Sequence, residues 1–159
     1  MSIGRWSIQL LPGTTLRRDQ GALAGVIEGC QNPPVLTVGV VALGVTDVER
    51  AAAFWREALG YDVRTDGFGG WATVLTPRVG SGTKIALQRS QTPVQDHPRL
   101  HLDLHVADAA EQAAEATRLV SLGAERVDWD SYPDDPDFVV LADPDGNRFC
   151  IVDLGHQHG

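Results

Sequence analysis

A short segment near residue 100 carries the side chains best suited to chemistry. His101, Asp103 and His105 alternate with leucines and a valine. Successive side chains of a β-strand point to opposite faces, so the apolar residues would share one face and the polar residues the other. Imidazole and carboxylate groups on one surface can exchange protons with a bound molecule or ligate a metal ion. We therefore predict that the leucine face, which includes Leu100, packs under helices while the polar row faces a cavity.

Two further polar side chains occupy alternate positions of a later predicted strand. Arg148 and Cys150 are two residues apart, so both should face the cavity if either does. A guanidinium is suited to binding carboxylate groups. Val38, Val40 and Ala42 fill the corresponding positions of the first predicted strand. The expected pocket thus has one apolar wall and one polar wall, as small-molecule sites commonly do.

Three interpretations of the polar row remain open. In the first, His101 and His105, with Asp103, hold a metal ion, and Cys150 supplies a further ligand. In the second, His101 is a general acid or base that Asp103 orients, and Arg148 binds an anionic group of the ligand. In the third, Asp103 pairs with Arg148, and the histidines form hydrogen bonds at the pocket rim without catalysis.

The elements that position these side chains occur as two similar sets. The first set starts with a strand at 36–45 and continues with a helix, for which Thr46 is the predicted N-cap and Glu49 completes a capping box. Apolar residues recur at helical spacing up to Gly60, the predicted C-cap. Further strands are predicted at 61–65, 71–76 and 84–88, with glycine turns between them.

The second set repeats this order. A strand at 100–106 precedes a helix that Asp108 caps and that ends at Gly123. Strands follow at 125–129, 138–142 and 148–152, and the Asp-Pro-Asp-Gly sequence at 143–146 is a strong turn signal. An internal repeat of this kind fixes the architecture, and it places a pocket between the two halves.

The repeat defines one domain over residues 35–154. Its modules span about 36–90 and 99–154, and Pro93 and Pro98 mark the connection between them. Residues 1–34 have no clear period and are interpreted as an N-terminal extension outside the domain. Residues 155–159 form a tail.

Composition excludes several classes of partner. The net charge of −8 opposes binding to nucleic acid. No apolar run approaches the roughly 20 residues of a membrane helix. The two cysteines, Cys30 and Cys150, do not make a disulfide framework. We therefore expect a cytoplasmic protein that contacts neither nucleic acid nor membrane.

Four motifs in the same order resemble those of the vicinal-oxygen-chelate superfamily, which includes glyoxalase I, extradiol dioxygenases and bleomycin-resistance proteins. They are Val-Val-Ala-Leu-Gly-Val-Thr-Asp at 40–47, Phe-Trp-Arg-Glu-Ala-Leu-Gly at 54–60, His-Leu-Asp-Leu-His-Val at 101–106 and Asp-Pro-Asp-Gly-Asn-Arg-Phe-Cys at 143–150. The second pair is most similar to the glyoxalase-like domain subgroup. The resemblance implies an α+β fold of two βαβββ modules that form a curved mixed sheet around a central cavity.

Metal-dependent members of the superfamily place ligands at four inward-facing strand positions. The corresponding positions here are Val40, Ala86 (or Gln88 if the register shifts by one pleat), His101 and Cys150. His101 alone is a plain match, and valine and alanine cannot ligate a metal. The resemblance therefore implies no bound metal or other cofactor, with a divalent metal as the alternative.

The expected function is binding of a small molecule, with metal-independent chemistry on a carbonyl- or carboxylate-bearing compound. One alternative is a non-catalytic binding or sequestration protein of the bleomycin-resistance type, which pairs into homodimers. The second is a divalent-metal lyase or dioxygenase. Whether the chain is an enzyme stays open, and any activity would be that of a glyoxalase-like lyase or isomerase, or of a dioxygenase relative. The candidate catalytic residues are His101 and Asp103, and the candidate substrate-binding residues are His105, Arg148, Cys150, Gln88, Val40 and Trp71.

Overall fold

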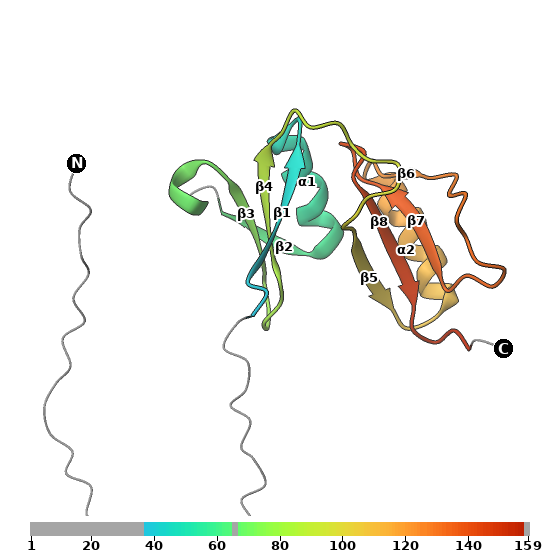
Figure 1. Ribbon diagram of the computed structural model, residues 1–159. Coiled ribbons are helices and arrows are strands. Elements are labelled where there is room, and N and C mark those ends of the chain that lie inside the picture. The colour runs from blue at the N-terminus through green and yellow to red at the C-terminus, as the bar shows by residue number, and fades with distance from the viewer. Residues whose placement is uncertain (1–36, 65–66, 158–159) are drawn as a thin grey trace, which may run out of the picture. The chain divides into compact units, whose positions relative to one another are not determined.

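The computed structural model of the protein describes residues 37–64 and 67–157. The predicted N-terminal extension and Cys30 lie outside these residues. These described residues belong to one compact unit, in which two modules of the order βαβββ follow one another (Figure 1). This arrangement confirms the predicted α+β fold with two βαβββ modules.

The first module forms a four-stranded sheet in the order β1-β4-β3-β2. β1 and β4 are parallel, and the other neighbours are antiparallel. Its elements are β1 (Val40–Val45), α1 (Val48–Leu59), β2 (Tyr61–Arg64), the short 3₁₀ helix η1 (Gly67–Gly70), β3 (Thr73–Pro77) and β4 (Lys84–Arg89).

The second module repeats this topology with the order β5-β8-β7-β6. Here β5 and β8 are parallel, and the remaining pairs are antiparallel. Its elements are β5 (Leu102–Val106), α2 (Ala109–Ser121), β6 (Glu125–Arg126), β7 (Phe138–Ala142) and β8 (Arg148–Asp153). Both sheets are therefore mixed, as predicted.

The start of α1 differs from the prediction. Its N-cap is Asp47, whose carboxylate accepts a hydrogen bond from the backbone N–H of Arg50 at 3.0 Å. The predicted cap, Thr46, instead donates its hydroxyl to Asp145 of the second module. Because the Thr46 side chain forms this tertiary contact, the next residue, Asp47, caps the helix. Gly60 ends the helix in the left-handed conformation, with φ of 63°, as predicted.

Other boundaries shift by a few residues. The C-cap of α2 is Leu122, and Gly123 follows it with φ of 111°. β6 ends at Arg126 rather than at residue 129, and β5 begins at Leu102. The last shift leaves His101 just before the strand.

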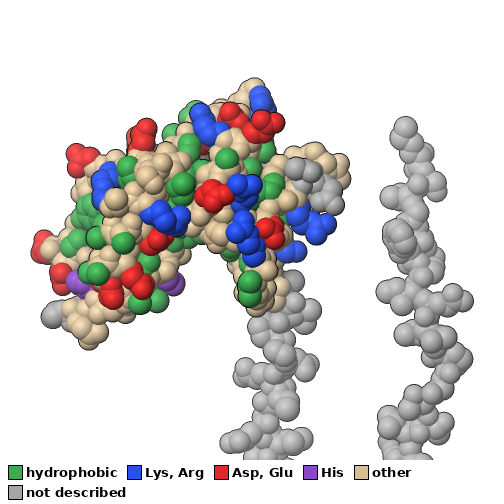
Figure 2. All heavy atoms as spheres, turned by 180° about the vertical axis from the view of Figure 1, so that it is seen from behind, with side chains coloured by type: hydrophobic (Ala, Val, Ile, Leu, Met, Phe, Trp, Pro, Cys, Tyr) green, Lys and Arg blue, Asp and Glu red, His purple; other side chains and the backbone are tan. Residues whose placement is uncertain are grey.

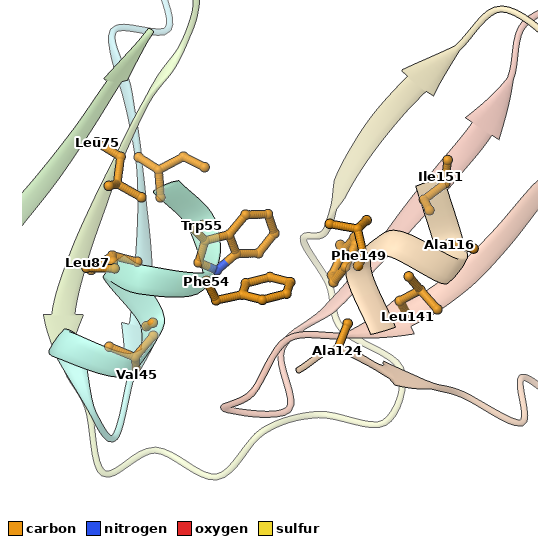
Figure 3. Packing of buried hydrophobic residues seen from close by; sticks show 14 residues of the cluster. Val45, Phe54, Trp55, Leu75, Leu87, Ala116, Ala124, Leu141, Phe149 and Ile151 are labelled. Carbon is orange, nitrogen blue, oxygen red and sulfur yellow. The ribbon is translucent and has the colours of Figure 1, made fainter. Parts of the chain in front are cut away.

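Aromatic packing joins the two modules into one core. Trp55 of α1 and Phe149 of β8 are both 1% exposed, and their ring centroids lie 5.2 Å apart (Figure 3). Phe54 contacts both rings. Leu102, Leu104 and Val106 pack against this core, which agrees with the predicted leucine face. The prediction was wrong for Leu100, which is 71% exposed because it precedes β5.

The buried carboxylate of Asp143, in the turn before β8, also contacts α1. The indole Nε1 of Trp55 donates to Oδ2 of Asp143 at 3.0 Å, and Asp143 is 2% exposed. The backbone N–H groups of Asp145 and Asn147 donate to its other oxygen, each at 2.9 Å. The amide of Asn147 donates both to Asp143 and to the carbonyl of Gly44 in β1. These bonds compensate the cost of burying the carboxylate.

Asp145 extends the contact to the start of α1. Its Oδ1 accepts hydrogen bonds from the backbone N–H groups of Thr46 and Asp47 and from the guanidinium of Arg50. Burial raises the pKa of Asp145, but these hydrogen bonds, with that of the Thr46 hydroxyl, outweigh it and lower the pKa below its usual value. A lowered pKa means that this contact stabilises the fold at neutral pH and is lost only as the pH falls through that pKa.

The surface carries charged side chains of both signs (Figure 2). Figure 2 shows acidic and basic side chains interspersed on the displayed face, without a large basic patch. In the described parts of the chain, no helix combines the length and apolar character needed to cross a membrane.

We predict that Asp143→Asn destabilises the protein by about 2 kcal/mol, because one acceptor oxygen becomes a donor that faces N–H groups in a buried position. The exposed Asp134→Asn is the matched control, with an expected change within about 0.5 kcal/mol. Urea unfolding at pH 7 measures both free energies. Equal unfolding midpoints for the two variants would contradict the role assigned to Asp143.

Candidate functional site

A cleft of about 430 Å³ lies between the modules, where the duplication predicts a pocket. This volume lies within the range of about 300–1,000 Å³ that is usual for small-molecule sites. Its walls come from β1 and α1 of the first module, from the connection between the modules, and from the first residues of β5 and β8. The lining residues are 41–44, 55, 90, 92–95, 98–102 and 147–149.

His101 lies in this wall beside Asp103. The imidazole Nε2 is 3.2 Å from Oδ1 of Asp103, and both side chains are about half exposed. Their spacing of two residues places them on one side of the chain, as predicted from strand alternation. The structure therefore brings the two candidate catalytic residues into contact.

Cys150 approaches the same carboxylate from β8. Asp103 is paired with Cys150 across the parallel β5 and β8 strands. Burial, the charge of Asp103 and a hydrogen bond to that carboxylate raise the pKa of the Cys150 thiol to about 12. The candidate ligand atoms of His101, Asp103 and Cys150 lie within 4.8 Å of one another. Asp103 is thus shared between an imidazole and a protonated thiol.

Arg148 lines the cleft at the start of β8. One terminal nitrogen, NH2, lies 3.1 Å from Oδ1 of Asp96 in the connection. Its Nε is buried and has no hydrogen-bond partner among the described residues. The pairing of Asp103 with Arg148, which belongs to the third interpretation, is not found in the described structure, because each side chain has a different partner.

The first-module candidates lie outside the cleft lining. Val40 packs against Ala72, Val74 and Ala86 in a small apolar cluster. Gln88 is half-buried beside Gly44 across the β1–β4 pair, and the side chain of Trp71 is 70% exposed. His105 of the second module is exposed opposite Val152 and is also absent from the lining.

This arrangement does not fit the superfamily's metal site, which draws ligands from both modules. Val40 and Ala86 occupy the two first-module positions. Val40 packs against the apolar cluster that contains Ala86. Neither side chain has a donor atom, and Gln88, the alternative position, lies outside the cleft lining. The three donors that the structure does bring together all belong to the second module.

Sequence reasoning missed the contribution of the connection. Arg99 lines the cleft, and Asp96 contacts Arg148. Pro93 and Pro98 mark this segment as irregular, but irregular chain has no period from which side-chain direction could be inferred. The signal that could have indicated this contribution is the presence of charged residues in the short connection, since the predicted pocket lies between the modules that it joins.

We predict that Cys150 is unreactive in the folded protein. The Cys30→Ser variant leaves Cys150 as the single thiol. With a pKa of about 12 instead of the ordinary 9.0, its alkylation by iodoacetamide at pH 8 should be at least about a hundredfold slower in the folded than in the urea-unfolded variant. The raised pKa also means that folding stability declines above about pH 9, where only the unfolded thiol ionises.

Asp103→Asn, added to Cys30→Ser, should accelerate alkylation of the folded protein, since it removes the negative charge that disfavours the thiolate. Mass spectrometry of timed samples gives both rates. Equal rates for Cys150 in the folded and unfolded states would contradict the prediction.

Comparison with known proteins supports the fold. A glyoxalase/bleomycin resistance protein/dioxygenase family enzyme from Burkholderia phytofirmans PsJN aligns with a TM-score of 0.59 at 14% identity, covering 75% of this chain and 99% of that one. Lactoylglutathione lyase from Agrobacterium tumefaciens gives 0.51 at 20% identity, with 77% and 96% covered. TnmS3, an antibiotic binding protein from Streptomyces sp. CB03234, gives 0.51 at 22% identity, with 75% and 96% covered.

No significant match was found among curated protein sequences. A family model described as "Glyoxalase-like domain" matches residues 40–152, which include both modules and the cleft between them. Together with the two βαβββ modules, this match shows that the chain belongs to the glyoxalase-like domain family of the vicinal-oxygen-chelate superfamily.

Proposed function

We propose that the protein binds a small carboxylate-bearing carbonyl compound in the inter-module cleft and catalyses proton transfer on it without a metal. In this proposal His101 is the acid–base group, Asp103 positions it, and Arg148 binds the carboxylate of the compound. The supporting observation is that His101 and Arg148 line one cleft, and that Asp103, which is outside the lining, lies 3.2 Å from His101.

The contact with Asp103 assigns different roles to the two ring nitrogens of His101. Nε2 faces the carboxylate, which favours the tautomer that carries its proton on Nε2. Nδ1 then has a lone pair with which to accept a proton from a ligand. A carboxylate on the far side of an imidazole also stabilises the positive charge that the ring acquires.

The remaining lining suits the other parts of such a compound. Leu43, Leu102 and Phe149 offer apolar contact, and Arg148 supplies a guanidinium that pairs with planar oxyanions. A base beside a bound carbonyl compound can remove a proton from the carbon next to the carbonyl and return it at a neighbouring atom. The product is an isomer of the substrate, so the reaction needs no co-reactant.

The fold itself does not separate catalysis from binding. Its solved relatives include proteins described as a lactoylglutathione lyase and as an antibiotic binding protein, and one fold commonly hosts unrelated functions. The distinction between catalysis and binding therefore depends on the side chains of the cleft. A general base and an anion-binding group in one cleft favour catalysis over sequestration.

The proposal predicts deuterium incorporation next to the carbonyl when members of a panel of 2-oxo acids are incubated with the protein in D₂O. ¹H NMR measures the rate. His101→Gln should slow exchange by about 10²–10⁴-fold, the usual contribution of a general base. Asp103→Asn should slow it less, because the imidazole is retained.

His156→Gln, on the C-terminal segment, is the control and should leave the rate unchanged. A compound that binds to the wild-type protein yet shows neither exchange nor a product would contradict catalysis and indicate sequestration. Unaltered exchange in His101→Gln would reject the role assigned to His101.

A second candidate is a metal-assisted reaction, because the ligand atoms of His101, Asp103 and Cys150 lie within 4.8 Å of one another. One nitrogen, one oxygen and one sulfur donor form a set that Zn²⁺ or Co²⁺ accepts, with a fourth position open. A metal ion held there would polarise a carbonyl oxygen. Coordination would require loss of the Cys150 proton, which the high pKa of this thiol opposes.

If this second candidate is correct, Co²⁺ added to the protein produces the near-ultraviolet absorption band of a cobalt–thiolate bond. The band should persist in Cys30→Ser and disappear in Cys150→Ser, since the chain has two cysteines. A titration without a band, in protein that remains folded, would reject the metal site.

A further inference from the structure

Arg148 uses only part of its hydrogen-bonding capacity in the described structure. Its NH2 group contacts Asp96, while its Nε–H is buried without a partner. An unpaired buried donor is unfavourable. Nε and one terminal nitrogen form a fork that binds two oxygens of one carboxylate in parallel. Arg148 therefore has donors for two oxygens of one ligand but contacts a single carboxylate oxygen.

That oxygen belongs to the connection between the modules. Asp96 is in contact with Arg148 at 3.1 Å, yet its side chain is 86% exposed. An ion pair with such an exposed partner contributes little stability, on the order of 0–1 kcal/mol. Asp96 can therefore be displaced at low cost by an anion that makes better contacts with Arg148.

The neighbouring residues hold the connection over the cleft by separate contacts. His97 lies 2.8 Å from Asp130, and its ring packs against Trp129 with centroids 4.7 Å apart. At its other end, the backbone N–H of Ser90 donates to the carbonyl of Val45. Release of Asp96 from Arg148 thus requires movement of one side chain and leaves these anchors in place.

We propose that Asp96 is an internal competitor that occupies the anion-binding position of Arg148 until a two-oxygen anion, such as a carboxylate, displaces it. This inference rests on the proposed function and extends it, because it names the group that the ligand must replace. A neutral ligand gains nothing from this exchange. Asp96 therefore makes the cleft selective for compounds whose anionic group binds both Nε and NH2 of Arg148.

The test compares two dyes of nearly the same shape. 8-Anilinonaphthalene-1-sulfonate carries an oxyanion, whereas N-phenyl-1-naphthylamine lacks it, and both increase in fluorescence in apolar sites. Asp96→Asn should tighten binding of the anionic dye about two- to fivefold, which is the effect of removing a weak exposed ion pair that competes with it. Affinity for the neutral dye should not change.

Two further variants separate this inference from the function on which it rests. Asp134→Asn makes the same change in net charge in the segment between β6 and β7 and should leave both affinities unchanged. Arg148→Gln should weaken the anionic dye, and in Arg148→Gln the additional change Asp96→Asn should have no effect. Lower ionic strength should enlarge the gain in Asp96→Asn.

The outcomes are distinguishable. If Arg148→Gln weakens the anionic dye but Asp96→Asn leaves it unchanged, competition by Asp96 is wrong and anion binding by Arg148 stands. If Arg148→Gln leaves the anionic dye unchanged, both the competition and the proposed anion site are wrong. An equal gain in Asp96→Asn and Asp134→Asn would reduce the effect to net charge and also overturn the inference.

Discussion

The buried carboxylate of Asp143 is the contact on which the relation between the two modules depends. It accepts hydrogen bonds from the indole of Trp55, from two backbone N–H groups of its own turn and from the amide of Asn147. A carboxylate that is 2% exposed would be strongly unfavourable without these donors. Because one donor is on α1 and the others are in the turn before β8, satisfying the carboxylate fixes one module against the other.

This contact also determines where the cleft lies, and it makes the two modules unequal. Docking of the turn brings Arg148, the first residue of β8, next to β1, and both line the cleft. The corresponding turn of the first module does not dock in this way: Val79 is 90% exposed, and Arg78 pairs with Asp62 of its own module. The duplicated topology thus carries one anchoring turn, and the module that supplies it also carries His101 and Arg148, the candidate acid–base and anion-binding groups of the cleft.

The sequence was sufficient for elements whose signals are local. Strand alternation predicted that His101 and Asp103 share a side, and the Asp-Pro-Asp-Gly sequence predicted the turn before β8, because both depend on neighbours along the chain. The predictions from sequence were wrong where a side chain has a partner that is distant along the chain. Thr46 lost its capping role to a contact with Asp145, and the partner of Arg148 turned out to be Asp96 in an irregular segment. Neither partner can be inferred from spacing, since each contact bridges segments that only the tertiary fold brings together.

Asp103 limits the chemistry that one site can perform. Its carboxylate lies against the imidazole of His101 and accepts a hydrogen bond from the Cys150 thiol. If Asp103 and Cys150 ligate a metal, the thiol proton is lost, and the imidazole nitrogen that faces Asp103 becomes a ligand rather than a proton carrier. Acid–base catalysis and metal binding therefore require different protonation states of the same three residues. The high pKa of Cys150, with the apolar first-module positions Val40 and Ala86, favours the state in which the thiol stays protonated and His101 exchanges protons with the ligand.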